Sequence, residues 1–173
     1  GDGWSDVAGF SRGVVRPRVR YEPGTGTTVF FTGGAIVENR DGGTQDGAVA
    51  PDGHPFAQTV DTRRADAGAL ARWVAGSRVI AVRGSYARSA QSHGYGDTIE
   101  RGVRDTLFGE ATIAWAAGRH TLVAGAAIQQ DGYAARDAAL ERFDYRFTAP
   151  AIFAQDQIAL GGIRIDDANQ LDP

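Results

Sequence analysis

Three histidines are the side chains of this sequence best suited to metal or acid–base chemistry, because imidazole binds metals and titrates near neutral pH. They are His54, His93 and His120. No two of them are two or four residues apart, so a zinc site would have to be assembled from distant segments. His54 and His93 fall in two predicted loops, where they could contact a metal chelate. His120 follows a predicted tight turn and is expected to hydrogen-bond the backbone at a rim.

Charged side chains alternate with apolar ones along several segments. The expected register places four carboxylates and four arginines on one polar face: Glu38, Asp66, Glu110, Asp144, Arg64, Arg72, Arg83 and Arg146. Two carboxylates on neighbouring strands could serve a glycosidase, but a lattice of ion pairs lining a wet lumen is the interpretation that we favour. All 18 basic residues are arginine, whose planar guanidinium group bridges several oxygens at once.

The sequence lacks the common signatures of catalysis. It has no cysteine for nucleophilic or thiolate chemistry, no G-x-S-x-G elbow and no phosphate-binding loop with a following lysine. We therefore expect neither an enzyme nor a bound cofactor.

The candidate ligand-binding residues are aromatic, imidazole and guanidinium side chains in the predicted long loops. They are His54, Phe56, His93, Tyr95, Arg101 and Tyr133. Rings and cations gathered at one end of a sheet would suit an anionic chelate with ring systems. Ordinary composition of exposed loops is the alternative explanation.

Length and composition limit the class of protein. With 173 residues the chain is long enough to bury a core, and its net charge of −3 argues against a nucleic-acid partner. The sequence contains no run of about 18 apolar residues, so it predicts no transmembrane helix. A membrane β-barrel is not excluded, because strands that alternate between lipid-facing and lumen-facing residues have a low mean hydropathy.

The elements that would position these side chains are strands of period two. Seven segments alternate, and an eighth could begin after them: residues 15–21, 27–39, 58–74, 78–88, 104–116, 120–130, 143–160 and 163–165. The pattern predicts an all-β fold, an antiparallel up-and-down meander that is part of a transmembrane β-barrel.

The connections between these segments alternate between short and long. Residues 40–57, 89–102 and 131–142 are predicted long loops, and the other connections are tight turns, which is the asymmetry of outer-membrane barrels. Trp73 and Trp115 lie on the apolar side next to tight turns, where an aromatic girdle would meet the bilayer surface. Two tryptophans that cap the core of a soluble barrel are the alternative.

Several stretches resemble the barrel of TonB-dependent outer-membrane receptors. They are residues 28–34 (TVFFTGG), 38–44 (ENRDGGT), 61–68 (DTRRADAG), 82–86 (VRGSY), 105–112 (DTLFGEAT), 118–121 (GRHT), 143–145 (FDY) and 150–156 (PAIFAQD). Their order over residues 10–160 carries the resemblance. It implies a segment of such a barrel over residues 1–165, followed by a polar tail over 166–173.

The resemblance implies a function and a set of partners. The parent protein would lie in the bacterial outer membrane, contact its lipid, and bind and import a small chelate such as a ferric siderophore or cobalamin. It would engage the TonB complex through a plug region for which these residues show no counterpart. Because the sequence also lacks an initiator methionine and a signal peptide, we expect an internal piece of that receptor.

Two other interpretations remain at this stage. The length also suits a small autonomous eight-stranded barrel, either a membrane barrel or a lipocalin-like binder. A soluble all-β enzyme is the third, and no constellation of residues supports it.

Overall fold

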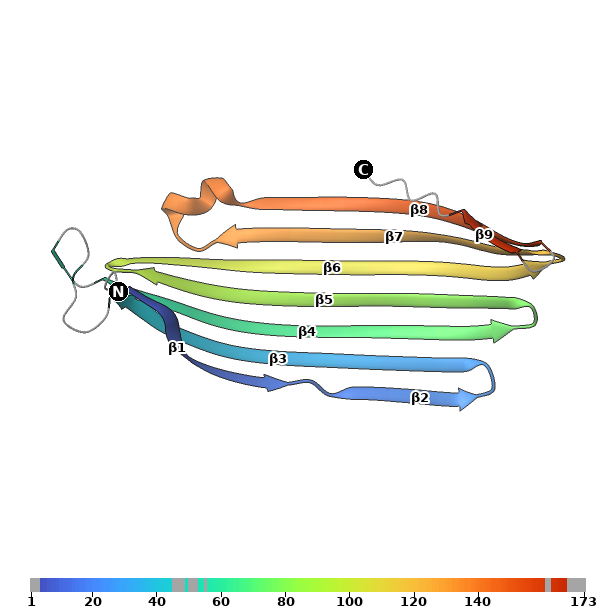
Figure 1. Ribbon diagram of the computed structural model, residues 1–173, viewed down its shortest axis with the longest axis horizontal. Coiled ribbons are helices and arrows are strands. Elements are labelled where there is room, and N and C mark those ends of the chain that lie inside the picture. The colour runs from blue at the N-terminus through green and yellow to red at the C-terminus, as the bar shows by residue number, and fades with distance from the viewer. Residues whose placement is uncertain (1–3, 45–48, 50–52, 55, 161–162, 168–173) are drawn as a thin grey trace.

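The computed structural model describes residues 4–44, 49, 53–54, 56–160 and 163–167. Within these ranges the chain forms one nine-stranded antiparallel sheet (Figure 1). Its elements are β1 (Trp4–Val15), β2 (Arg18–Gly24), β3 (Thr27–Thr44), β4 (Ala57–Ala75), β5 (Arg78–Tyr95), β6 (Thr98–Ala117), β7 (His120–Ala135), the 3-10 helix η1 (Ala138–Phe143), β8 (Tyr145–Leu160) and β9 (Ile163–Asp167). From β2 to β9 each strand pairs with the next as a meander, which confirms the predicted fold class.

The first position in the sheet holds two strands, β1 and β2, placed end to end along β3. Pro17 separates them because it has no N–H to donate to the ladder, and its carbonyl accepts a bond from the Gly33 N–H at 3.2 Å. The prediction of a first strand over 15–21 missed β1, in which Gly9 and Gly13 weaken the alternating pattern. At the other edge, β9 ends at Asp167, two residues inside the predicted polar tail.

One predicted long loop is wrong. β5 and β6 continue past their predicted ends and are joined by a two-residue turn, so most of residues 89–102 is strand. Gly96 takes a φ of +57° in this turn, a conformation that glycine adopts without steric cost. The end of β3, the start of β4 and the segment that contains η1 lie at the same end of the sheet (Figure 1). We call this the loop end, and the opposite end, which holds the two-residue turns that precede β3, β5 and β7, the turn end.

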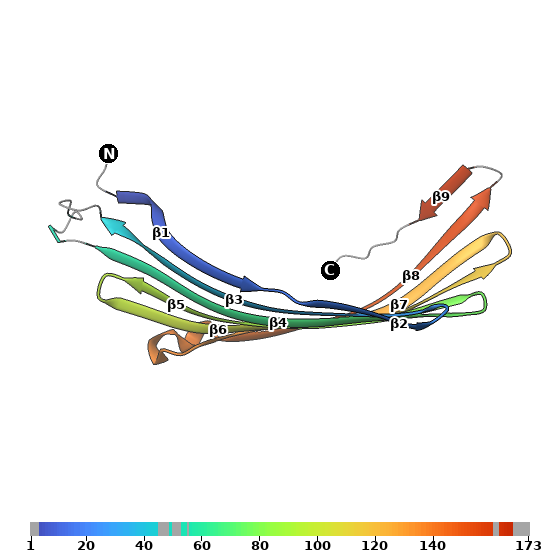
Figure 2. The ribbon, with the colours of Figure 1, turned by 90° about the horizontal axis from the view of Figure 1, so that it is seen from below.

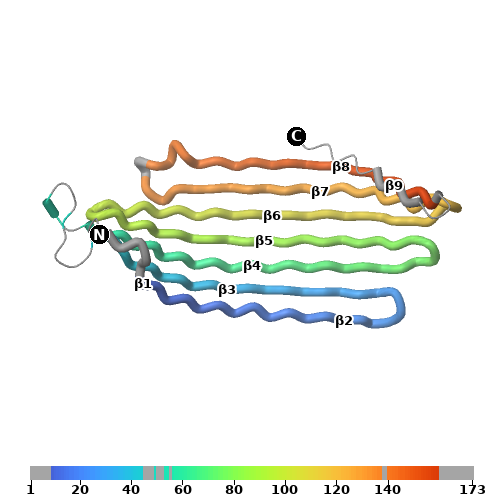
Figure 3. The backbone as a smooth tube through the Cα atoms, in the orientation of Figure 1, coloured from blue at the N-terminus to red at the C-terminus, as the bar shows by residue number. Residues whose placement is uncertain are grey.

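The sheet is a single curved and twisted layer (Figure 2), and its long strands run side by side along the whole molecule (Figure 3). Its accessible surface is 12460 Å², whereas a compact protein of this mass exposes about 8,000 Å². Val103, at 6% exposure, is the one buried apolar side chain among the described residues. None of their helices is long and apolar enough to cross a membrane.

Candidate functional site

The two faces of the sheet differ in chemistry, because directly paired residues share a face and successive residues alternate. One face, called here the apolar face, carries a continuous row across six strands: Val29, Ala71, Val82, Ala111, Ala126 and Ile152. The opposite face, the polar face, carries most of the ion pairs. The predicted two-sided character of the strands is therefore confirmed.

Apolar side chains on the apolar face form a band of limited height. On β4 it runs over Ala65, Ala67, Ala69, Ala71 and Trp73. Nine residues of strand at a tilt near 40° span about 23 Å, close to the height of about 25 Å of the lipid-facing band of a membrane barrel. Trp73 and Trp115 lie at its turn-end border, as predicted for a girdle.

The other border of the band is polar. The Tyr86 hydroxyl donates a hydrogen bond to Asp105, whose carboxylate also pairs with Arg88 at 3.5 Å. Tyr86 combines an apolar ring with a polar tip and therefore suits a boundary between lipid and water.

The polar face holds a lattice of ion pairs. Its members are Arg12–Glu38, Arg40–Glu38, Arg16–Asp66, Arg64–Asp66, Arg83–Glu110 and Arg104–Asp131, with oxygen–nitrogen distances between 2.6 and 3.5 Å. The predicted lattice is therefore confirmed for Glu38, Asp66 and Glu110. It is wrong for Asp144, which accepts the Ala135 N–H at 2.6 Å. It is also wrong for Arg146, whose pairing with Gly132 places it on the apolar face.

Arg104, Asp131 and Tyr145 form the most connected group of the polar face, towards the loop end. Arg104 donates two hydrogen bonds to the Asp131 carboxylate, at 3.1 and 2.6 Å, and the Tyr145 hydroxyl donates a third at 3.3 Å. These hydrogen bonds tie β6, β7 and β8 together on the polar face.

The structure separates the six predicted ligand-binding residues. His93, Tyr95 and Tyr133 lie on strands and on the polar face, not in loops, because β5 and β7 are longer than predicted. Arg101 is also on a strand, but on the apolar face. One small ligand does not contact both faces, so the structure divides the predicted set between the two faces, and its role in binding stays a prediction.

The polar-face members form two aromatic pairs. The rings of His93 and Tyr95 stack at 6.1 Å, and the His93 Nδ1 atom lies 3.3 Å from the Tyr95 hydroxyl. Tyr133 stacks on Tyr145 at 6.2 Å. Tyr133 lies two strands and four residues away from His93, a separation of about 16 Å from strand spacing and rise. The two pairs could therefore contact different parts of one extended ligand.

His54 and Phe56 belong to the segment before β4. The Phe56 amide and carbonyl both bond with Thr44, at 3.0 and 2.9 Å, which closes the loop onto the end of β3. A side chain at Gly96 would lie 3.2 Å from the Phe56 ring, so this ring covers the β5–β6 turn. The position of Phe56 indicates a structural role in holding three strand ends together.

Sequence reasoning missed Arg104, Asp131 and Tyr145 as members of a site. Arg104 already belongs to the alternating segment 104–116, and extending the segment 120–130 by one position would have placed Asp131 on the same face. Placing Asp144 and Arg146 on the polar side put Tyr145 on the other side, which is wrong, since Tyr145 pairs directly with Tyr133. No group of three histidine or acidic side chains that could hold a metal ion occurs in the part of the chain that the structure describes.

A single-layer antiparallel sheet with long strands, two-residue turns at one end and two chemically distinct faces is the architecture of a β-barrel segment. A solved structure with a similar fold carries the name copper transporter OprC: the TM-score is 0.71 at 15% sequence identity, and the match covers 88% of this chain. The chain spans only 27% of that structure's length. No known family model matches the sequence, and no curated protein matches it.

Proposed function

We propose that this chain is a segment of a TonB-dependent receptor barrel in the bacterial outer membrane, which binds and imports a small nutrient chelate such as a ferric siderophore or cobalamin. The observation that carries the proposal is the pair of faces: an apolar band of bilayer height on one side and ion pairs with aromatic side chains on the other. The resemblance of the sequence motifs supports the receptor class, and the similar fold of a copper transporter supports transport.

Lipid is the partner that best suits the apolar face. Ile152 is 90% exposed and Phe31 51% exposed in the single layer, and water would make such exposure costly along a whole face. A bilayer removes this cost, and the closed hydrogen bonding of a barrel satisfies the backbone within it.

The polar face towards the loop end suits a ligand with rings and negative charge. Its tyrosines can stack on flat groups, and its arginines can bind carboxylate or hydroxamate oxygens. A bare metal cation would instead need converging carboxylate, imidazole or sulfur ligands, and this segment contains neither cysteine nor methionine.

The membrane part of the proposal can be tested with single cysteines, since the sequence has none of its own. Ala69 and Ser85 lie one residue apart in height, because Ala69 pairs with Gly84, and they lie on opposite faces. In proteoliposomes we expect Ser85→Cys to react with a small charged thiol reagent, and Ala69→Cys to react only after the protein is unfolded. Equal labelling of the two cysteines in the folded protein would contradict a lipid-facing band.

The transport part can be tested by uptake of labelled ferric siderophore, cobalamin and copper chelate into cells that make the parent protein. We expect uptake of one of them to stop in cells that lack TonB. Tyr133→Ala should raise the KM of uptake about 2- to 10-fold, the value of one aromatic contact. Tyr21→Ala, on the apolar face, is the matched control and should leave the KM unchanged.

Uptake that persists without TonB would favour a small passive barrel over the receptor. If Tyr133→Ala and Tyr21→Ala behave alike while uptake still depends on TonB, the receptor class stands and the assignment of the ligand surface fails.

A further inference from the structure

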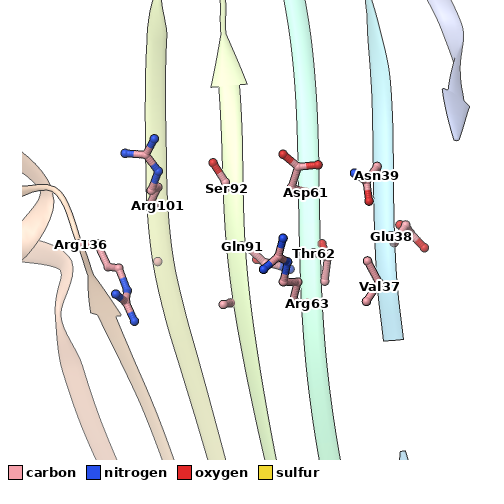
Figure 4. Close-up of a pocket in the computed structure, with 12 residues that line it drawn as sticks. Val37, Glu38, Asn39, Asp61, Thr62, Arg63, Gln91, Ser92, Arg101 and Arg136 are labelled. Atoms are coloured by element: carbon pink, nitrogen blue, oxygen red, sulfur yellow. The ribbon is translucent and has the colours of Figure 1, made fainter. Parts of the chain in front are cut away.

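Above the apolar band, towards the loop end, the apolar face carries a row of polar side chains at one height. Asn39, Asp61, Ser92 and Arg101 pair directly across four adjacent strands (Figure 4). Arg136 continues this row, since its N–H donates to the Arg101 carbonyl at 2.8 Å. The row therefore lies where the polar surface of a bilayer would meet the barrel.

A hollow of about 430 Å³ opens among these side chains, and Arg63, Arg101 and Arg136 line it. All three arginines are exposed, and none forms an ion pair with another described residue. Many arginines of the polar face differ, since Arg12, Arg40, Arg16, Arg64, Arg83 and Arg104 pair with carboxylates. Three unneutralised guanidinium groups in one hollow favour an anion.

The acidic groups near the hollow do not cancel this charge. Glu38 also lines it, but its carboxylate pairs with Arg12 and Arg40 on the polar face. The Asp137 carboxylate accepts the Arg101 backbone N–H at 2.7 Å. Asp61 is the remaining carboxylate among the lining residues, against three arginines.

A second hollow lies in line with the first, within the apolar band. It is a groove of about 450 Å³ with a floor of small residues, Ala67, Ala69 and Gly84, between Phe31 on one side and Leu107 on the other. Along β4 the two hollows are joined by the small side chain of Ala65. Four residues of strand separate Arg63 from Ala67, about 13 Å.

We propose that these two hollows together bind one phosphate-bearing lipid of the outer leaflet: its phosphate among Arg63, Arg101 and Arg136, and one acyl chain along the groove. The inference rests on the membrane part of the proposed function. Arginine clusters at a membrane surface attract anionic headgroups, and guanidinium matches phosphate geometry bidentately. A free anion would use only the first hollow. A lipid uses both, because the arginines lie at the depth of its phosphate and the groove at the depth of its acyl chain.

The test is native mass spectrometry of the purified protein released from phosphatidylcholine nanodiscs that contain 10 mol% phosphatidic acid as the probe. We expect one retained phosphatidic acid on the wild-type protein. The triple variant Arg63→Gln, Arg101→Gln, Arg136→Gln should bind it roughly 100-fold more weakly, at about fivefold for each arginine. The matched control is the triple variant Arg18→Gln, Arg72→Gln, Arg78→Gln, which removes the same charge from the half of the sheet nearer the turn end. We expect it to retain the lipid.

A second variant separates a lipid from a free anion. Ala67→Phe fills the groove without changing charge, and we expect it to weaken phosphatidic acid retention while the three arginines remain. Unchanged retention in Ala67→Phe, together with displacement of the adduct by inorganic phosphate, would overturn the lipid in favour of a simple anion site. Equal retention by both triple variants would overturn the site itself.

The failure of this inference can be distinguished from failure of the proposed function. A protein that enters the nanodiscs and transports its chelate but retains no anionic lipid overturns the lipid site alone. If the protein retains the lipid but shows no TonB-dependent uptake, the lipid site stands and the receptor assignment is overturned. A parent protein that does not enter the nanodiscs overturns both.

Discussion

Ala69→Arg is expected to lower the free energy of unfolding in a bilayer by about 2–4 kcal/mol, because an arginine on the lipid face near the midplane destabilises a barrel by that amount. Ala69 lies midway between Ala65 and Trp73, at the centre of the apolar band, and its side chain is exposed. The guanidinium group would have to remain charged in hydrocarbon or draw water into the bilayer, and either carries a large free-energy cost.

The matched control is Ser85→Arg, one residue away in height on the polar face. There the guanidinium group meets the wet side of the sheet, and we expect a change below about 1 kcal/mol. Urea unfolding of both variants in lipid vesicles measures the difference. If the two substitutions cost the same, the apolar face is not in contact with lipid.

Gly43→Ala is expected to destabilise the loop end by about 1–3 kcal/mol, the cost of a strained non-glycine conformation. Gly43 has a φ of +122°, and a Cβ atom there would overlap the Phe56 carbonyl oxygen and lie 3.1 Å from the Ala57 Cα atom. These are backbone atoms, so the clash can be relieved only by moving β4 away from β3.

Amide hydrogen exchange locates this effect. The Thr44 N–H donates to Phe56 and the Gly96 N–H to Ala57, so both amides should exchange faster in Gly43→Ala. Gly33→Ala, on the same strand, is the control, since its Cβ would meet the nearest atom at an ordinary 3.7 Å. Unchanged protection at Thr44 and Gly96 would show that the β3–β4 closure tolerates the substitution.

The strands were predictable where side chains alternate without interruption. The pattern of residues 58–74 gave nearly all of β4, because Ala65 to Trp73 and the intervening charges differ strongly in polarity. β1 was missed because glycines provide no side chain to mark a face. The ends of β5 and β6 were missed because Ser, Gln and Gly near the loop end resemble loop composition although their backbone continues the ladder.

The candidate site was only partly predictable, for the same reason. His93, Tyr95 and Tyr133 were selected by chemistry, and they share the polar face. Arg101 was grouped with them because residues of a loop are not assigned to a face. On a strand, neighbouring residues point to opposite faces, so a shift of one position moves a side chain to the other side of the sheet.

By itself the sequence determined what is local: an alternation of period two, turns marked by glycine, and a polar and an apolar side to each strand. Tertiary structure decided which strands extend, and which side chains meet at one height. Arg63, Arg101 and Arg136 come from three separate parts of the chain, and so do Arg104, Asp131 and Tyr145. Their meeting depends on register, a property of pairs of strands that are distant in sequence, and the periodicity of a single strand does not contain it.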